Sequence, residues 1–172
     1  MLDYTLVSPK ATYRMPTPRD LPGLLRLVQA FHAESQRGTE MTTDQVLATV
    51  GEMSRHKEKG SFFVFESKGE MAGYAILVTR WSNELGGTVL AVDELFVDPA
   101  HRRRGVAGDF LGLLKKVVPA DVKAIRLEAG RASKPALALC RKLGFQDTGR
   151  QVFSLTVGRE ERGSVALAGA NG

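Results

Sequence analysis

The spacing of apolar residues predicts two helices in the first third of the chain. The stretch "PRDLPGLLRLVQAFHAES", residues 18–35, repeats leucine, valine and phenylalanine at intervals of three and four, as one face of a helix requires. Asp20 and Pro22 are suitable start signals for this helix. The stretch "TTDQVLATVGEMSRH", residues 42–56, repeats the pattern more weakly, with Thr43 as its candidate N-cap.

From residue 61 the pattern changes to strands. Runs rich in aromatic and β-branched residues predict strands at 61–67, 71–81 and 86–99, and "KGE" before the second is a hairpin connection that contains Gly69. A short, partly alternating segment at 12–17 predicts an earlier strand, and the residues before it are either a loose leader or an added strand.

The remaining pattern predicts a helix at 105–118, a strand at 122–129, a helix at 134–145 and a last strand at 151–157. The order is β-α-α-β-β-β-α-β-α-β, which predicts an α/β (α+β) fold with a mixed, mostly antiparallel sheet flanked by helices. The 172 residues suit one domain. We expect its core at about 12–157 and a flexible tail at 158–172.

Composition narrows the class of protein without fixing the partner. The formal net charge of +5 suits a nucleic acid or an anionic cofactor equally well. The single cysteine, Cys140, excludes an intramolecular disulfide. The chain lacks a signal-peptide pattern and any apolar run of membrane-spanning length, so we expect a cytoplasmic protein without membrane contact. His32, His56 and His101 lack metal-ligand spacing, so we expect no metal site.

One segment, "HRRRGVAGDFL" at 101–111, combines three arginines with glycines and the start of a helix. A glycine-rich turn between a strand and a helix presents free N–H groups at the positive end of the helix dipole, which is a seat for phosphate. Neither G-x-x-x-x-G-K-[ST] nor G-x-G-x-x-G is present where a nucleotide fold would need it. A nucleic-acid patch is the alternative, but a second basic cluster with interleaved aromatics is missing.

The residues of this segment resemble a known family. Arg102-x-x-Gly105-x-Ala107 is similar to the R/Q-x-x-G-x-G/A signature of the GNAT superfamily of acetyl-CoA-dependent N-acetyltransferases, within "VDELFVDPAHRRRGVAGDFL". The stretches "KPALALCRKLGF" and "YRMPTPRDLPGLLRL" also resemble segments of that family. The resemblance covers about residues 12–157.

The resemblance implies the GNAT fold and acetyl-CoA as co-substrate. Main-chain N–H groups of about 103–108 would hold the diphosphate, and the strand before them would pair with the pantetheine arm. The implied cofactor-binding residues are Leu95, Phe96, Val97, Arg102, Arg103, Arg104, Gly105, Val106, Ala107, Gly108 and Ser133.

Acetyl transfer to an amine needs a base, because an alkylamine is protonated at neutral pH. Asp93 and Glu94 lie where several GNAT members keep an acidic residue, and alternation along a strand lets at most one of them face the reaction. "VDELFV" resembles the L-E-D-F-F-V of polyamine-type members, which favours Asp93 and leaves Glu94 close by. Cys140 stands where the family often has a tyrosine acid, and it is either a proton donor or a small core residue.

The sequence leaves the acceptor open. Tyr74 and Trp81 are candidates for the acceptor pocket or ordinary aromatics, and "RWSNELGG" is the loop that we expect to touch it. We expect an N-acetyltransferase that acts on a primary amine, first of all on a small molecule, by direct attack in a ternary complex. The alternatives are a non-catalytic acyl-CoA-binding module and a basic nucleic-acid binder. The pattern does not decide between a monomer and a homodimer.

Overall fold

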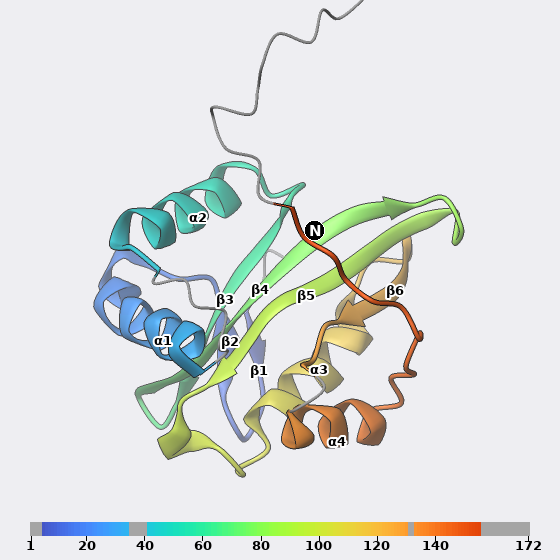
Figure 1. The fold of residues 1–172 in the computed structure, drawn as a ribbon. Coiled ribbons are helices and arrows are strands. Elements are labelled where there is room, and N and C mark those ends of the chain that lie inside the picture. Colours follow the sequence, from blue (N-terminus) through green and yellow to red (C-terminus); the bar gives the residue numbers. More distant parts are fainter. Residues whose placement is uncertain (1–4, 35–40, 131–132, 156–172) are drawn as a thin grey trace, which may run out of the picture.

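The computed structural model describes residues 5–34, 41–130 and 133–155 (Figure 1). As far as α4 its elements follow the expected order, with one added strand at the start. They are β1 (Leu6–Val7), β2 (Thr12–Arg14), the 3-10 turn η1 (Pro18–Asp20), α1 (Leu21–Glu34), α2 (Thr43–Arg55), β3 (Gly60–Ser67), β4 (Glu70–Ser82), β5 (Gly87–Val97), the 3-10 turn η2 (Pro99–His101), α3 (Val106–Val117), β6 (Val122–Leu127) and α4 (Lys134–Lys142).

The strands form one sheet in the order β1-β2-β3-β4-β5-β6. Neighbouring strands are antiparallel except β5 and β6, which are parallel and joined by α3. Lys68 and Gly69 connect β3 and β4, and both have positive φ, as a two-residue type I′ turn requires. The expected mixed, mostly antiparallel sheet is confirmed.

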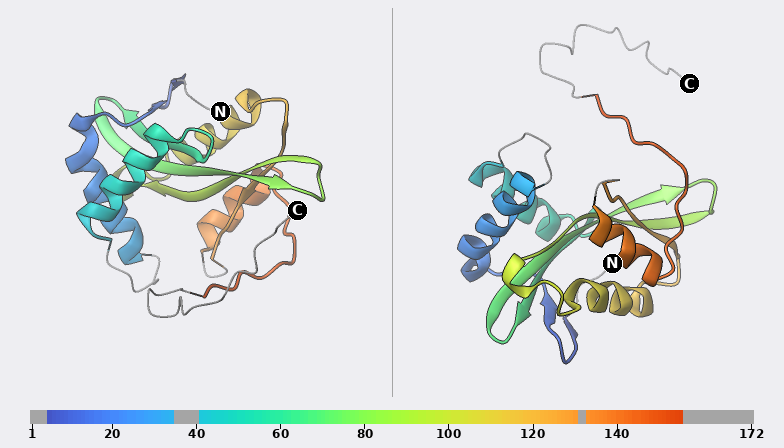
Figure 2. Two further views of the ribbon diagram at one scale, coloured as in Figure 1. Left: turned by 90° about the horizontal axis from the view of Figure 1, so that it is seen from above. Right: turned by 60° about the horizontal axis from the view of Figure 1, so that its bottom comes forward.

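Helices cover both faces of the sheet (Figure 2). Alternate residues of β3 point to opposite faces: Phe62 and Val64 pack with α1 and α2, whereas Phe63 and Phe65 pack with α3. This strand is buried on both sides, so its sequence is a continuous apolar run. The fourth helix, α4, lies beside α3 (Figure 1), where the Leu139 side chain approaches Gly108.

Two expectations about local structure were wrong. The N-cap of α2 is Thr42 rather than Thr43, because Thr42 and Gln45 form a reciprocal capping box. The expected last strand is missing over 151–155, where Val152, Phe153 and Leu155 are exposed by 70%, 88% and 85%. Its alternation suits a strand, but none of the described strands pairs with it, and a strand without a partner leaves its main chain unbonded.

Residues 156–157 of that segment and the expected tail at 158–172 lie outside the described residues. None of the helices within 5–34, 41–130 and 133–155 has the length and hydropathy needed to cross a membrane.

Candidate functional site

The parallel pair β5 and β6 separates before β5 ends. The last paired residues are Val92 and Leu127, yet β5 continues to Val97. Residues 93–97 therefore have β4 on one side and no described strand on the other. We call this unpaired side the open edge of β5.

Backbone alternation decides which residues present hydrogen-bonding groups at the open edge. The Asp98 N–H donates to the Ala72 carbonyl at 2.9 Å, so Asp98 and, two residues earlier, Phe96 turn their main-chain groups toward β4. Leu95 and Val97 must then face the open edge. The pantetheine arm of an acyl-CoA needs free main-chain N–H and C=O groups as partners. Phe96 was expected among these partners, but its main-chain groups face β4.

A β-bulge lies at the start of the open edge. Ile76 pairs with Glu94 and Leu77 pairs with Val92, so Asp93 is an extra residue in β5. Val92 packs in the core under α3, whereas Glu94, two residues later, lies on the α1 face. The bulge breaks the alternation of β5 between Val92 and Glu94, and Asp93 itself is exposed.

Glu94 is held by side chains from two other elements. The Tyr74 hydroxyl, on β4, donates to Oε2 at 2.6 Å, and Nε2 of His32, on α1, lies 3.2 Å from Oε1. The side chains of His32 and Glu94 are each only 11% exposed. Burial, together with the Glu94 charge, raises the pKa of Tyr74, so its hydroxyl remains a donor. The result is an oriented, largely buried carboxylate beside the open edge.

The N-terminus of α3 offers unbonded N–H groups at the other end of the open edge. Gly105 is the N-cap in the left-handed conformation, with φ of 80° and no side-chain cap. The Asp109 N–H closes the first turn on the Gly105 carbonyl at 2.9 Å. The N–H groups of Val106, Ala107 and Gly108 therefore have no partner within the helix, which makes this end an anion seat.

The three consecutive arginines do not act together. Nη2 of Arg102 lies 2.8 Å from both carboxylate oxygens of Glu34, and its Nε donates to the Val97 carbonyl at 2.9 Å. Its guanidinium also lies over the Phe96 ring, at 5.2 Å. Arg103 and Arg104 are exposed beside Gly105 and form no ion pair within the described residues. Of the three arginines, Arg103 and Arg104 are therefore the two whose side chains are available to an anion at α3.

The turn between β5 and α3 is fixed by Asp98. One carboxylate oxygen accepts from the Ala100 N–H at 2.9 Å, and the other accepts from Arg26 on α1 at 2.7 Å. Burial alone would raise the pKa of Asp98, but these two donors hold it below its usual value. The turn is therefore anchored to α1 by an ionised side chain.

Three other sequence candidates lie on α4 and near the far end of β4. Ser133 is the exposed N-cap of α4, and Cys140 is half-buried on the same helix, where burial raises the pKa of its thiol. Trp81 is 69% exposed near the far end of β4. It stands seven residues from Tyr74 along the strand, a separation of roughly 23 Å, so the structure does not bring Trp81 to the open edge.

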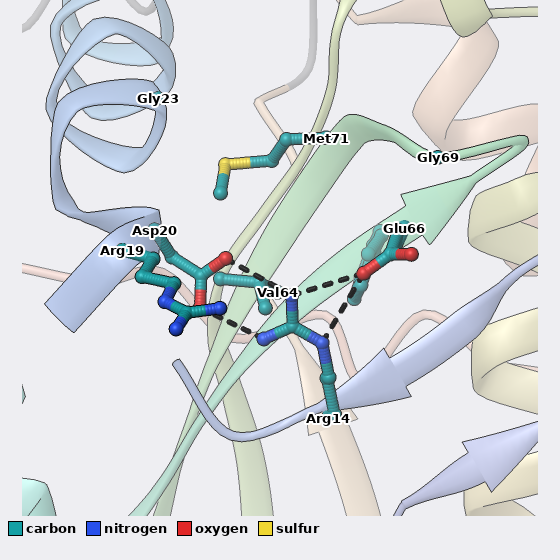
Figure 3. Close-up of a pocket in the computed structure, with 9 residues that line it drawn as sticks. Arg14, Arg19, Asp20, Gly23, Val64, Glu66, Gly69 and Met71 are labelled. Atoms are coloured by element: carbon teal, nitrogen blue, oxygen red, sulfur yellow. Dashed lines mark hydrogen bonds and ion pairs between the residues drawn. The ribbon is translucent and has the colours of Figure 1, made fainter. Parts of the chain in front are cut away.

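A separate pocket of about 330 Å³ lies between η1, α1 and the start of β4 (Figure 3). Arg14 crosses it, and its five N–H donors all have protein acceptors, namely Asp20, Glu66 and the Met15 carbonyl. A saturated guanidinium has no donor left for a ligand, so this network is structural. The pocket is lined by Arg14, Arg19, Asp20, Gly23, Val64, Phe65, Glu66, Gly69 and Met71.

His32 and its contact with Glu94 were missed by sequence reasoning, which treated His32 only as one of three scattered histidines. The two residues are 62 positions apart, and no local motif links them. Within the described parts of the chain, His, Cys, Asp and Glu form no group of three or more that could hold a metal.

Comparison with solved structures shows where this fold occurs. A possible acetyltransferase from Clostridium difficile 630 has a TM-score of 0.72 and 18% identity, over 86% of this chain and 98% of the other. The aminoglycoside N-acetyltransferase AAC(6')-Iy in complex with CoA has a TM-score of 0.69 and 19% identity, over 88% and 99%. The ribosomal-protein-alanine N-acetyltransferase from Brucella melitensis biovar Abortus 2308 has a TM-score of 0.66 and 15% identity, over 86% and 99%.

The comparison with protein families covers the site. No curated protein sequence matches the chain significantly. The model of the acetyltransferase (GNAT) family, however, matches residues 25–145, which include the open edge of β5, Glu94 and the N-terminus of α3. The chain therefore belongs to the GNAT family and is an acetyl-CoA-dependent N-acetyltransferase.

Proposed function

We propose that the protein transfers the acetyl group of acetyl-CoA to the primary amine of a small molecule, by direct attack within a ternary complex. One observation carries this proposal: the open edge of β5 runs from the oriented carboxylate of Glu94 to the anion seat at α3. A donor bound along that edge would have its phosphates and its reactive end at opposite ends of one strand.

The residues present fit acetyl-CoA, which supplies an activated acyl group as a thioester. The N–H groups of Val106, Ala107 and Gly108, with the positive end of the helix dipole, suit its diphosphate. Arg103 and Arg104 add charge around the same seat. The main-chain N–H and C=O groups of Leu95 and the N–H group of Val97 suit the amides of the pantetheine arm, because the Val97 carbonyl already accepts from Nε of Arg102.

Glu94 is our choice for the base. Its carboxylate is fixed by Tyr74 and His32, so it can accept the amine proton, directly or through one water, without reorienting. Exposed Asp93, on the bulge, is the alternative base and is otherwise a group that attracts a cationic acceptor. Cys140 keeps its proton at neutral pH because burial raises its pKa, so it is available as an acid for the thiolate.

The acceptor class is proposed from the acceptors of other proteins with this fold. The solved structures of this fold include aminoglycoside and ribosomal-protein-alanine N-acetyltransferases, which represent small-molecule and protein acceptors. We propose a small-molecule amine, without a nucleic-acid partner. Polyamines, aminoglycosides, amino acids and peptides with a free N-terminal alanine are the acceptors to compare.

The test is release of the CoA thiol with that panel of amines, for wild type, Glu94→Gln and Asp93→Asn. We expect at least one amine to be acetylated, and Glu94→Gln to lower kcat about 100-fold while the affinity for acetyl-CoA is kept. Asp93→Asn is the matched control, because it removes a neighbouring carboxylate. A larger loss in Asp93→Asn would move the base to Asp93, and tight acetyl-CoA binding without turnover of any amine would indicate a non-catalytic module.

A further inference from the structure

The N-terminal hairpin places one more cation at the anion seat. Its turn is closed by the Ser8 N–H, which donates to the Ala11 carbonyl at 3.0 Å. The Ser67 hydroxyl of β3 donates to the Lys10 carbonyl at 2.8 Å and fixes the turn to the sheet. The hairpin residues 6–14 precede residues 25–145, which the family model matches, so the family signature says nothing about this hairpin.

The same hairpin lies beside the N-terminus of α3 (Figures 1 and 2), and side-chain hydrogen bonds join it to the first turn of that helix. The Tyr13 hydroxyl, on fully buried Tyr13, lies 2.7 Å from the Asp109 carboxylate and 3.0 Å from the Val106 carbonyl. The Ser8 hydroxyl donates to the same carboxylate oxygen of Asp109. The turn and the helix N-terminus therefore form one unit.

Lys10 lies at the tip of this unit, directly beside the α3 N-cap. A Cβ atom added to Gly105 would lie 2.7 Å from the Lys10 ammonium nitrogen. The side chain is exposed and forms no ion pair with a carboxylate of the described residues. The ammonium therefore lies next to the positive end of the helix dipole, where a cation is disfavoured.

Two further cations, Arg103 and Arg104, lie at this point, and neither is paired with a carboxylate of the residues that the structure describes. Elsewhere in the same region arginines are paired: Arg102 with Glu34, and Arg26 with Asp98. The acid of the first turn, Asp109, faces the hairpin hydroxyls instead of the cations. A group of like charges at a helix N-terminus is stabilised by a ligand with several negative charges, such as a phosphate ester or diphosphate.

We propose that Lys10 is a phosphate-binding residue for acetyl-CoA, delivered by the N-terminal hairpin to the seat at α3. This inference rests on the proposed placement of acetyl-CoA along β5. The ammonium can reach the diphosphate or the 3′-phosphate of the cofactor, which share the same chemistry. It touches neither the thioester nor the amine, so it strengthens binding of the donor and leaves the chemical step unchanged.

The experiment is calorimetric titration of the full chain with CoA and with dephospho-CoA, which lacks the 3′-phosphate. Wild type is compared with Lys10→Gln, Lys10→Arg and Lys116→Gln. Lys116, exposed in the last turn of the same helix, gives a control with the same change in net charge. We expect Lys10→Gln to weaken CoA binding about tenfold, Lys10→Arg to bind almost as wild type, and Lys116→Gln to be unchanged.

The dephospho-CoA arm identifies the phosphate. If Lys10→Gln weakens dephospho-CoA binding as well, Lys10 contacts the diphosphate; if the defect vanishes, it contacts the 3′-phosphate. With an acetylated amine in hand, KM for acetyl-CoA should rise while kcat stays constant. Equal CoA affinity in wild type and Lys10→Gln overturns the role of Lys10 alone, whereas absence of CoA binding in wild type overturns the placement of acetyl-CoA and this inference together.

Discussion

Acidification should destabilise this protein through one identifiable carboxylate, Asp20. Arg14 donates to its two oxygens at 2.8 and 3.0 Å (Figure 3), and the Thr17 N–H also donates to this carboxylate, at 2.6 Å. These bonds, that from Arg14 foremost, lower the pKa of Asp20 from 3.8 to about 2. This hydrogen-bond network lies where α1 begins, and His32 on α1 contacts Glu94. The network therefore also helps to set the position of the proposed base.

The magnitude follows from linkage between protonation and folding. A folded-state pKa below the unfolded value means that the unfolded chain binds the proton more tightly. Asp20 therefore stabilises the fold fully above pH 3.8, and this contribution is lost as the pH falls toward 2. A difference of nearly two pKa units corresponds to about 2 kcal/mol. The Asp20 side chain is only 9% exposed, so solvent screening reduces this value little.

The assay is urea unfolding of wild type and Asp20→Asn between pH 7 and pH 2.5. We expect Asp20→Asn to lower the free energy of unfolding by about 2 kcal/mol at pH 7, and the gap to shrink as the pH falls below 4. Exposed Asp44, in the first turn of α2, gives the control variant Asp44→Asn. A gap that stays constant with pH, or one no larger than that of Asp44→Asn, would refute the reasoning.

Three further variants test the packing and the open edge. Deletion of Asp93 removes the extra residue of the bulge, so β5 should pair further along β6 and close part of the open edge. Calorimetry should then show a folded protein that binds CoA about tenfold more weakly. Unchanged CoA affinity would contradict the role of the bulge in keeping the edge open. Gly73→Ala puts a Cβ 2.3 Å from the Phe96 carbonyl oxygen. Thermal unfolding should show that the free energy of unfolding falls by about 3 kcal/mol, whereas the same change at a glycine with open space around it should not. Thr42→Ala removes the N-cap of α2 and should cost about 1 kcal/mol with unchanged acetyl transfer; a loss of activity at equal folding would assign Thr42 another role.

The sequence located most helices and strands because each carries its own periodicity. The strands at 60–67 and 70–82 were predicted to within one residue, since their apolar runs end at polar turn residues. The cap of α2 was predicted one residue too late, at Thr43, although the capping-box spacing of Thr42 and Gln45 could have identified it. The segment 151–155 shows where prediction from periodicity fails. Alternation of apolar and polar side chains suits a strand, but a strand also needs a neighbouring strand to pair with. That pairing depends on the whole fold and cannot be read from the local sequence.

In the candidate site, too, the part formed by one continuous segment was predictable from the sequence, and the contacts between distant residues were not. The anion seat at 102–108 is contiguous in sequence, so a motif could predict it. The contact between His32 and Glu94, and the placement of the Lys10 ammonium beside Gly105, bring together residues far apart in the chain. Neither pair has a spacing that could be recognised. Arg102 belongs to the motif, but its side chain is taken by Glu34, which only the position of α1 decides.

At the bulge, the regular alternation of a strand conflicts with the need of the Glu94 carboxylate for hydrogen-bond donors. That need explains why the bulge is present. Unbroken alternation would put Glu94 on the same face as Val92, in the apolar core under α3, where a carboxylate would be buried without donors. One extra residue moves Glu94 to the opposite face, where Tyr74 and His32 can bind it. The same insertion bends β5 just beyond its last pair with β6, so the open edge begins where the carboxylate is fixed. One residue that breaks the period of the strand therefore both orients the proposed base and leaves open the edge that we propose for acetyl-CoA.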